Sequence, residues 1–414
     1  MRGPEPPTAR LLDLTRLVSR VGRGPWTGID RVEAAYLSHL VQSPDMLFGL
    51  IAIPSGFALL DRDGVAALAA RLRGAVGWGR PDLRAMRRLR ARSEVRGADA
   101  DLRRLAVGVA SNAERLSGLF AEVLPRGFSW IATGHTNLKP TLFDAVHDAG
   151  GRAVVLVHDT IPLDHPAFQR PGTVAAFEER MRATALGADL VVCISEAARA
   201  SATSHFARFG RVPEMRVAHL GIDVSSPDPS GLPRDFPLNR DCFVTVGTIE
   251  PRKNHALLLD VWAHFAETLP EEEIPALHIV GARGWANEAV FARLDRSPLT
   301  GAHVFEWNRL SDGAVSAVVS RARALLMPSH AEGFGLPPAE AVALGTPVIA
   351  RDLPVYREVL GNNPVYLAED DLYSWANEIL AFARGRTRGQ SAAREEAPAL
   401  PTWQDHFNLV FKEI

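Results

Sequence analysis

Two glutamates in one glycine-rich stretch have the spacing of a ligand site. Residues 328–341, PSHAEGFGLPPAEA, carry Glu332 in a turn and Glu340 eight residues later, at the start of a predicted helix. Carboxylates accept hydrogen bonds from sugar and ribose hydroxyls, so we expect the two side chains to contact different parts of one extended ligand. The alternative is that Glu340 only complements the helix dipole and Glu332 is a solvated loop charge.

The turn between the two glutamates also favours an anion. Gly333 and Gly335 free the backbone of side-chain bulk, the proline pair at 337–338 suits a helix start, and Gly345 suits its end. The unpaired N–H groups at a helix start attract negative charge. We therefore expect a diphosphate beside this turn.

A second stretch supplies positive charge. Residues 246–254, VGTIEPRKN, lead from a strand into a loop and place Arg252 and Lys253 side by side ahead of a helix. At the carboxyl end of a strand, such a pair is a suitable counter-charge for a diphosphate leaving group. A solvated surface pair is the alternative.

The elements that must position these residues alternate between strand and helix, which predicts an α/β protein with doubly wound, parallel sheets. In the second half, the predicted strands cover residues 243–246, 276–280, 302–306, 324–327 and 347–350. The predicted helices there cover residues 256–269, 313–322, 338–344 and 353–360. In the first half, residues 128–133, 153–157 and 190–194 have the pattern of buried strands. Two Rossmann-like domains facing a central cleft are therefore expected.

Domain boundaries follow from composition. The 414 residues are too many for one ordinary core. Residues 225–240 are rich in proline, serine and charge, and they predict the crossing between domains. We predict an N-terminal domain at 1–235, a C-terminal domain at 236–395 and a final helix at 396–414 that returns to the N-terminal domain.

Composition limits the class of protein. Apolar residues make up 47% and charged residues 23%, as in globular proteins, and the net charge of −2 argues against a nucleic-acid partner. The two cysteines, Cys193 and Cys242, lie in apolar strand-like runs, which favours a reducing, cytoplasmic location. The apolar stretch 46–60 is interrupted by Pro54, Ser55 and Gly56 before it could span a bilayer. Arginines crowd between residues 71 and 104, among them Arg87, Arg88 and Arg90.

Together these strings resemble the donor site of the retaining GT-B glycosyltransferases of family 4. Glu332 and Glu340 match the family's E-x7-E signature, and residues 247–254 match its G-x-x-x-x-R-K-N string. The resemblance continues through HIVGARGW at 278–285, SEAAR at 195–199, HLGID at 219–223 and TW at 402–403. It covers nearly all of the chain from residue 128 onward.

The resemblance implies roles for individual residues. Arg252 and Lys253 would hold the diphosphate behind Gly247, Glu332 the donor sugar, and Glu340 the ribose. Backbone N–H groups would come from the turn that contains Gly333, Phe334, Gly335 and Leu336. His158, at the end of the strand in VLVHD, is similar to the family's histidine beside the donor sugar and is the further catalytic candidate; a structural histidine is the alternative.

Two more regions belong to the expected acceptor side. Gly28, in PWTGIDRVEAAYL, resembles the family's first glycine loop, which approaches the diphosphate; Arg31 and Asp159 are expected to face the acceptor. The alternative for Gly28 and Arg31 is a plain amphipathic helix. Trp307 and Asn308 stand where many relatives have glycine, which puts the base of the nucleotide in doubt.

The expected activity is hexose transfer, most similar to bacterial mannosyltransferases that use GDP-mannose in surface-polysaccharide synthesis. The acceptor is expected to be a glycan or a polyprenyl-diphosphate-linked oligosaccharide. The arginines of residues 71–104 would meet anionic lipid from the cytoplasmic side, or else form a solvated insertion. No aspartate-rich metal motif is evident, so we predict neither metal nor cofactor.

Several alternatives stay open. The same site could bind a UDP- or dTDP-sugar, since most nucleotide sugars share the hydroxyls that the two glutamates contact. An epimerase, a phosphorylase with lysine-bound pyridoxal phosphate, or a non-catalytic binder of nucleotide sugars or glycans could also use this fold.

Overall fold

The computed structural model describes residues 8–24, 26–86, 91–237, 241–368, 370–385 and 399–414. Several predictions lie outside these ranges: those for Arg87, Arg88 and Arg90, for residues 238–240 of the predicted crossing, and for the boundary at 395–396.

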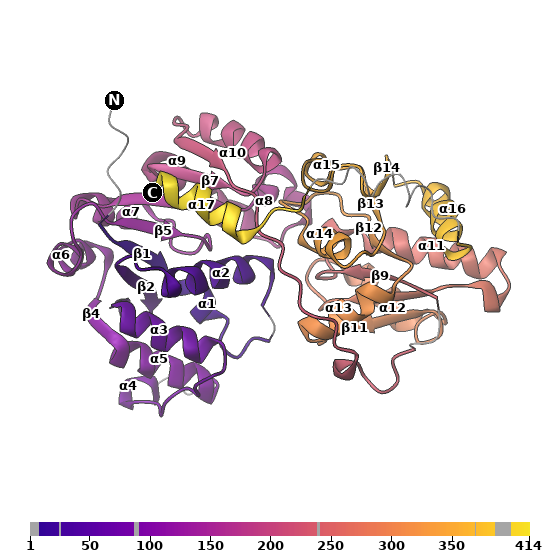
Figure 1. The fold of residues 1–414 in the computed structure, drawn as a ribbon, viewed down its shortest axis with the longest axis horizontal. Coiled ribbons are helices and arrows are strands. Elements are labelled where there is room, and N and C mark those ends of the chain that lie inside the picture. The colour runs from indigo at the N-terminus through magenta and orange to yellow at the C-terminus, as the bar shows by residue number, and fades with distance from the viewer. Residues whose placement is uncertain (1–7, 25, 87–90, 238–240, 369, 386–398) are drawn as a thin grey trace.

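The first half of the chain forms one sheet, whose strand order within the described residues is β4-β3-β2-β1-β5-β6-β7-β8 (Figure 1). The strands are β1 (Arg10–Asp13), β2 (Leu47–Ile53), β3 (Gly56–Leu60), β4 (Ala106–Ala110), β5 (Ser129–Ala132), β6 (Arg152–Val157), β7 (Leu190–Cys193) and β8 (Glu214–Val217). From β2 through β1 to β8 neighbouring strands are parallel, as predicted for the buried strands.

One edge of this sheet differs from the predicted parallel pattern. β3 is antiparallel to both β2 and β4. Only Pro54 and Ser55 separate β2 from β3, and a loop this short can join antiparallel strands but not parallel ones. The break in the apolar stretch 46–60 is therefore a hairpin turn.

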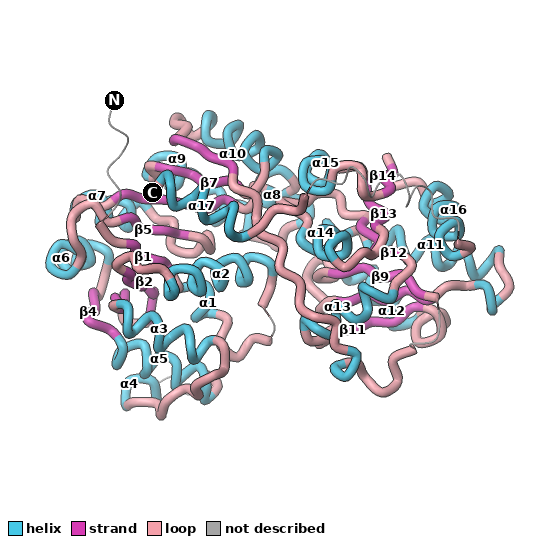
Figure 2. The backbone as a smooth tube through the Cα atoms, viewed as in Figure 1, coloured by secondary structure: helices cyan, strands magenta, loops and turns pink. Residues whose placement is uncertain are grey.

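Helices cover this sheet (Figure 2). They are α1 (Thr15–Ser19), α2 (Gly28–Gln42), α3 (Arg62–Leu72), α4 (Leu83–Met86), α5 (Ser93–Leu105), α6 (Ala113–Val123), α7 (Pro140–Asp148), α8 (Ile161–Asp164), η1 (Pro166–Phe168), α9 (Thr173–Gly187) and α10 (Glu196–Arg208). The segment after β8 contains η2 (Pro229–Gly231) and leads into the second half.

The second half forms a parallel sheet with the described strand order β11-β10-β9-β12-β13-β14. The strands are β9 (Cys242–Val246), β10 (Ala276–Val280), β11 (Val304–Trp307), β12 (Ala324–Met327), β13 (Val348–Arg351) and β14 (Val365–Leu367). The helices are η3 (Pro251–Lys253), α11 (His255–Thr268), η4 (Glu271–Glu273), α12 (Glu288–Arg296), α13 (Asp312–Arg321), α14 (Leu336–Ala343), α15 (Pro354–Leu360), α16 (Leu372–Ala383) and α17 (Trp403–Glu413).

The last helix, α17, lies on the first half of the chain rather than on the second (Figure 1). Tyr36 Oη on α2 is 2.8 Å from His406 Nε2 on α17, and the Arg10 guanidinium donates to the carbonyl of Ile414. Buried Phe407 and Val410 extend the apolar contact. Within the described residues, no helix is both long and apolar enough to cross a bilayer.

Candidate functional site

Glu332 lies between two cations at the carboxyl ends of β9 and β12. Its carboxylate oxygens are 2.8 Å from Arg252 Nη1 and 2.6 Å from Lys253 Nζ. Burial alone would favour the neutral acid, but Arg252 and Lys253 outweigh it and lower the pKa of Glu332 to about 2. The three side chains therefore form one cluster of ion pairs, in which Glu332 is ionised at neutral pH.

Glu250 and the backbone hold Arg252 in place. The guanidinium donates to Glu250 Oε1 at 2.6 Å and to the carbonyl of Ala331 at 2.6 Å. Glu250 is 4% exposed, so its carboxylate is available to Arg252 rather than to water. Glu250 was not among the predicted site residues, although it lies two residues before Arg252 in the same string.

Gly247 leaves room for the lysine. Its φ is +143°, and a Cβ there would come 3.1 Å from Lys253 Cε. Asn254 ends η3 in the left-handed conformation and starts α11, so the chain turns sharply behind the two cations. This turn points Lys253 back toward the end of β9.

The predicted helix after the glycine turn is α14, which begins at Leu336, two residues before the predicted start. Gly335 precedes it with φ +94°, and a Cβ there would come 2.6 Å from the Tyr356 ring. No side chain caps the start of α14, and Pro337 and Pro338 have no N–H, so among its first three residues Leu336 is the one that offers an N–H to a ligand. Phe334 is buried against His219 of the other domain.

Glu340 in α14 pairs with Arg31 in α2, across the two domains. Their closest atoms, Arg31 Nη1 and Glu340 Oε1, are 2.6 Å apart, and Arg31 also donates to the carbonyl of Asp223. Burial raises the pKa of Glu340, and Arg31 opposes that rise. The structure thus brings together two residues that the sequence assigned to donor and acceptor separately.

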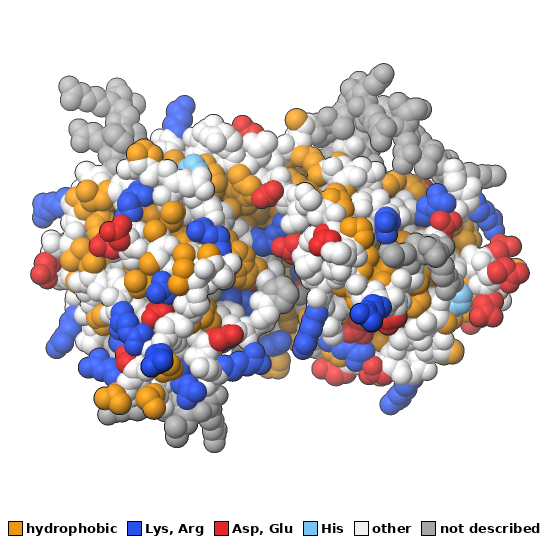
Figure 3. Space-filling model, turned by 60° about the horizontal axis from the view of Figure 1, so that its bottom comes forward, with side chains coloured by type: hydrophobic (Ala, Val, Ile, Leu, Met, Phe, Trp, Pro, Cys, Tyr) orange, Lys and Arg blue, Asp and Glu red, His pale blue; other side chains and the backbone are white. Residues whose placement is uncertain are grey.

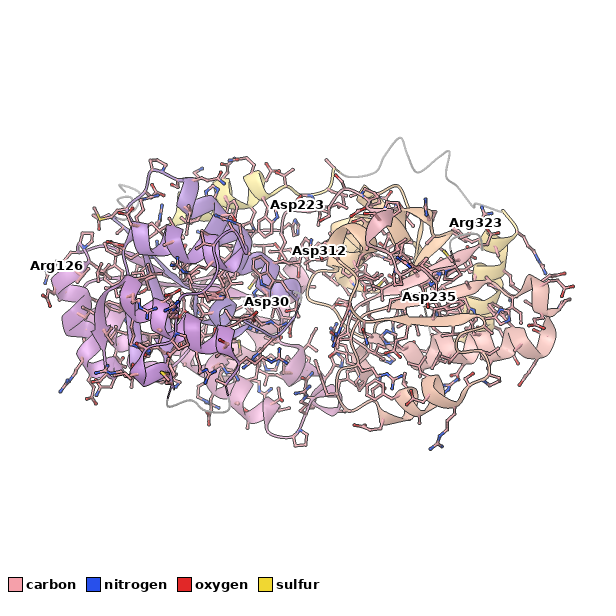
Figure 4. All side chains as sticks on the ribbon, turned by 90° about the horizontal axis from the view of Figure 1, so that it is seen from below. Asp30, Arg126, Asp223, Asp235, Asp312 and Arg323 are labelled. Atoms are coloured by element: carbon pink, nitrogen blue, oxygen red, sulfur yellow. The ribbon has the colours of Figure 1, made fainter. Side chains whose placement is uncertain are left out.

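Gly28 is fixed in the same place by a capping box. The Asp30 carboxylate accepts from Thr27 N at 2.7 Å and from Arg16 Nε at 2.7 Å, and Asp30 is fully buried. In Figure 4, Asp30 lies where the two domains meet. A Cβ on Gly28 would come 3.6 Å from Leu336 Cδ1, which places the start of α2 opposite the start of α14.

His158 and Asp159 follow β6 and face the glycine turn. A Cβ on Gly333 would come 2.5 Å from the carbonyl oxygen of His158 and 3.1 Å from Asp159 Cβ. Burial raises the pKa of Asp159, and the positive charge of Arg252 opposes this rise. The backbone of residues 158–159 and the Glu332 cluster therefore belong to one site.

The His158 ring has a defined protonation state. Its Nε2 lies 2.7 Å from the carbonyl oxygen of Thr133, and a carbonyl can only accept, so Nε2 carries the proton. Burial lowers the pKa of His158 to about 4. At neutral pH the ring is therefore neutral, with Nδ1 as its acceptor nitrogen.

Two further residues tie the domains together at this site. Buried Ser195, the N-cap of α10, donates to the carbonyl of Gly333 at 2.9 Å. Glu358 of α15 accepts from the backbone N–H groups of Glu196 and Ala197 and from His219. Ser195 and His219 lie in the SEAAR and HLGID strings, but Glu358 carries no signal that the sequence analysis used.

Trp307 is the last residue of β11, one position beyond the predicted strand end. Its Nε1 donates to His278 Nδ1 at 2.9 Å, and its ring lies 4.8 Å from that of Phe236. The departure from glycine therefore adds an aromatic contact to the segment that joins the domains. Asn308 directly follows the strand.

Several described arginines of residues 71–104 are paired with acids. Arg71 and Arg104 contact Asp101, and Arg103 contacts Asp82 and Asp99. These pairs hold α3, α4 and α5 together. Leu83 and Met86 on α4 are 84% and 54% exposed.

Two Rossmann-like domains that face each other across a charged cleft define the GT-B fold. Among solved structures, HepE from Anabaena in complex with UDP has this fold with a TM-score of 0.60 at 16% identity, over 98% of this chain and 99% of HepE. Sucrose-phosphate synthase from Thermosynechococcus elongatus has a TM-score of 0.51 at 17% identity, over 73% of this chain and 75% of the synthase.

Residues 233–390, in the second half of the chain, match the family Glycosyl transferases group 1. The chain is 32% identical over 290 residues to serotype-specific mannosyltransferase WbdA of Escherichia coli, covering 66% of this chain and 35% of WbdA. It is 34% identical over 143 residues to O-antigen chain mannosyltransferase RfbU of Salmonella typhimurium, covering 33% of this chain and 37% of RfbU. The aligned part thus spans about a third of the length of these relatives.

Proposed function

We propose that this protein is a retaining glycosyltransferase that transfers mannose from GDP-mannose to a glycan or polyprenyl-diphosphate-linked acceptor in bacterial surface-polysaccharide synthesis. The observation that carries the proposal is the cluster of Arg252, Lys253 and Glu332, which faces residues 158–159 across the cleft. The mannosyltransferase names of the relatives support the choice of sugar.

The proposed chemistry is electrostatic. When the bond between the sugar and the diphosphate breaks, negative charge grows on the diphosphate. Arg252, Lys253 and the N–H of Leu336 at the start of α14 stabilise that charge, at about 3 kcal/mol for each well-placed donor. The acceptor hydroxyl then attacks from the face that the diphosphate leaves and gives its proton to the departing diphosphate oxygen, which retains the anomeric configuration. Since two cations already meet the leaving group, the proposal includes neither metal nor cofactor.

Glu332 and His158 position the sugar in this proposal. The Glu332 carboxylate stays ionised because of its low pKa, so it accepts from sugar hydroxyls while it aligns both cations. His158, neutral and fixed through Thr133, offers Nδ1 as a second acceptor. Glu340 accepts hydrogen bonds from the ribose hydroxyls while its carboxylate stays paired with Arg31. Asp159 contacts the acceptor.

The proposal also includes a peripheral contact between this protein and the cytoplasmic face of a membrane. Exposed Leu83 and Met86 lie beside Arg80 and Arg84, for which no acidic partner is found within the described residues. Apolar side chains next to cations suit an anionic lipid surface, where each cation contributes about 1 kcal/mol.

The test is a donor screen by ligand-induced thermal shift with GDP-mannose, UDP-sugars and dTDP-sugars, on wild-type protein and Glu340→Ala. Selective stabilisation by GDP-mannose that weakens in the variant supports the donor and the ribose contact together. If only another nucleotide sugar stabilises the protein, the assignment of GDP-mannose as the donor is refuted. No stabilisation by any donor refutes the enzyme class.

A further inference from the structure

A groove separate from the charged cluster lies between α2, α17 and the second domain. Its volume is about 460 Å³, within the range of about 300–1,000 Å³ that ligand sites in proteins have. Arg31 and Leu336 line the end that adjoins the proposed donor site. From there the groove follows α2 past Ser38 to Gln42, so it is open for a ligand longer than one sugar.

The walls of the groove carry the groups that bind sugars. Trp26 and Trp403 are partly exposed, and Trp403 stacks on buried Phe407, with ring centroids 5.4 Å apart. An aromatic ring offers a flat apolar face to the C–H side of a sugar ring. Hydroxyl and amide groups also line the groove at Ser38, Gln42 and Gln404, and they can pair with sugar hydroxyls.

The charges at the cleft end of the groove exclude an anionic ligand. Asp223 and Asp312 line it and both raise the pKa of neighbouring Glu340, while Arg31 is the one cation among the groove-lining residues. Three carboxylates around one guanidinium repel a phosphate but accept hydrogen bonds from hydroxyls. Figure 3 shows a few acidic side chains where the two domains meet, and Figure 4 places Asp223 and Asp312 in this region.

We infer that this groove binds the neutral, non-reacting sugars of the acceptor glycan, and that Trp26 and Asp312 determine its affinity. The identification of this glycan as the acceptor rests on the proposed function. Asp312 comes from the second domain and Trp26 from the first, so a glycan in the groove contacts both domains. The non-reducing end of the glycan would then reach the cluster past Leu336.

The experiment measures mannotriose binding by saturation-transfer difference NMR on the full chain, as wild type, Trp26→Ala, Asp312→Asn and Asp63→Asn. Asp63 is exposed and lies in the first turn of α3, just as Asp312 lies in the first turn of α13. Asp63→Asn therefore removes a charge from a helix start outside the groove and is a matched control. The expected result is binding by wild type and Asp63→Asn, with at least a fivefold weaker signal in the other two variants.

Three results would overturn the inference: no binding by wild type, equal binding by all four proteins, or full displacement of mannotriose by GDP, which would make the groove part of the nucleotide site. GDP-mannose is titrated in parallel by thermal shift. If wild-type protein binds mannotriose but not GDP-mannose, the result counts against the proposed function alone. Intact GDP-mannose binding without mannotriose binding counts against the groove alone.

Discussion

The carbonyl of His158 in the first domain lies directly against Gly333 in the second, so close that a Cβ on Gly333 would come 2.5 Å from the carbonyl oxygen. Real Cβ atoms do not approach backbone this closely. The closed cleft therefore requires glycine at 333.

We predict that Gly333→Ala holds the two domains apart without damage to either core. Activity should fall by about 10²-fold or more, since misplacement by about 1 Å has this cost, while the melting temperature changes little. Small-angle scattering should show a larger radius of gyration. Gly118→Ala on α6 is the control, because a Cβ there meets nothing within 4 Å; equal activity of both variants would refute the close contact.

The two cations of the cluster should each matter for turnover. We expect Arg252→Ala and Lys253→Ala to lower kcat/KM by about 10²–10³-fold, the cost of a lost donor to a developing anion. The effects should not add, because both cations meet Glu332. Arg323→Ala removes only an exposed pair with Asp241 and should retain activity. A double variant with the product of both losses would argue against a shared cluster.

The Arg31–Glu340 pair predicts a pH effect on donor binding. Burial raises the pKa of Glu340 and Arg31 opposes the rise, so removal of Arg31 should raise this pKa further. A protonated Glu340 accepts fewer hydrogen bonds from ribose. In Arg31→Ala, donor affinity should therefore begin to fall at a higher pH than in wild type, as measured by calorimetry from pH 8 to about 5. Arg293→Ala, which breaks a surface pair with Asp260, should leave the profile unchanged.

Buried histidines should make the fold sensitive to acid. Burial lowers the pKa of His255 to about 3 and of His158 and His406 to about 4. Between these values and about 6.5 the unfolded chain binds more protons, so stability falls as pH falls. Each histidine contributes a slope of about 1.4 kcal/mol per pH unit, which denaturant unfolding at pH 7.5 to 5 can measure.

His255 allows that slope to be tested singly. Neither ring nitrogen has a hydrogen-bond partner among the described residues, and the side chain is 1% exposed. His255→Leu should keep or raise the stability at pH 7.5, since an unpaired buried polar group costs about 1–3 kcal/mol. It should also reduce the dependence of stability on pH by the contribution of one histidine. His147→Leu, at an exposed position, is the comparison. A marked loss of stability in His255→Leu would indicate a hidden partner.

Local patterns predicted most of the second domain. β10 and β12 match the predicted ranges, and α11 and α13 each differ by one residue at both ends, because buried apolar runs and their turn residues lie next to each other in the sequence. β3 and β4 were missed, since an edge hairpin has weaker periodicity than a buried strand. Strand β14, only three residues long, gave no pattern at all.

For the site, sequence strings identified residues but not their partners. Arg252, Lys253 and Glu332 were expected in one site, yet nothing in the sequence indicated that Glu332 would contact both cations. The contacts of Ser195 and Glu358 join residues more than 130 positions apart, and only the folded chain brings them together. Long-range pairing of this kind depends on how two domains meet, which no local pattern encodes.

The return of α17 to the first domain means that the chain passes between the domains twice, once after β8 and once before α17. Because both connections would have to extend together, they limit how far the two domains can separate. A single proteolytic cut in either connection would leave the two halves joined by the other, so such a nicked protein should still migrate as one particle in native gel filtration.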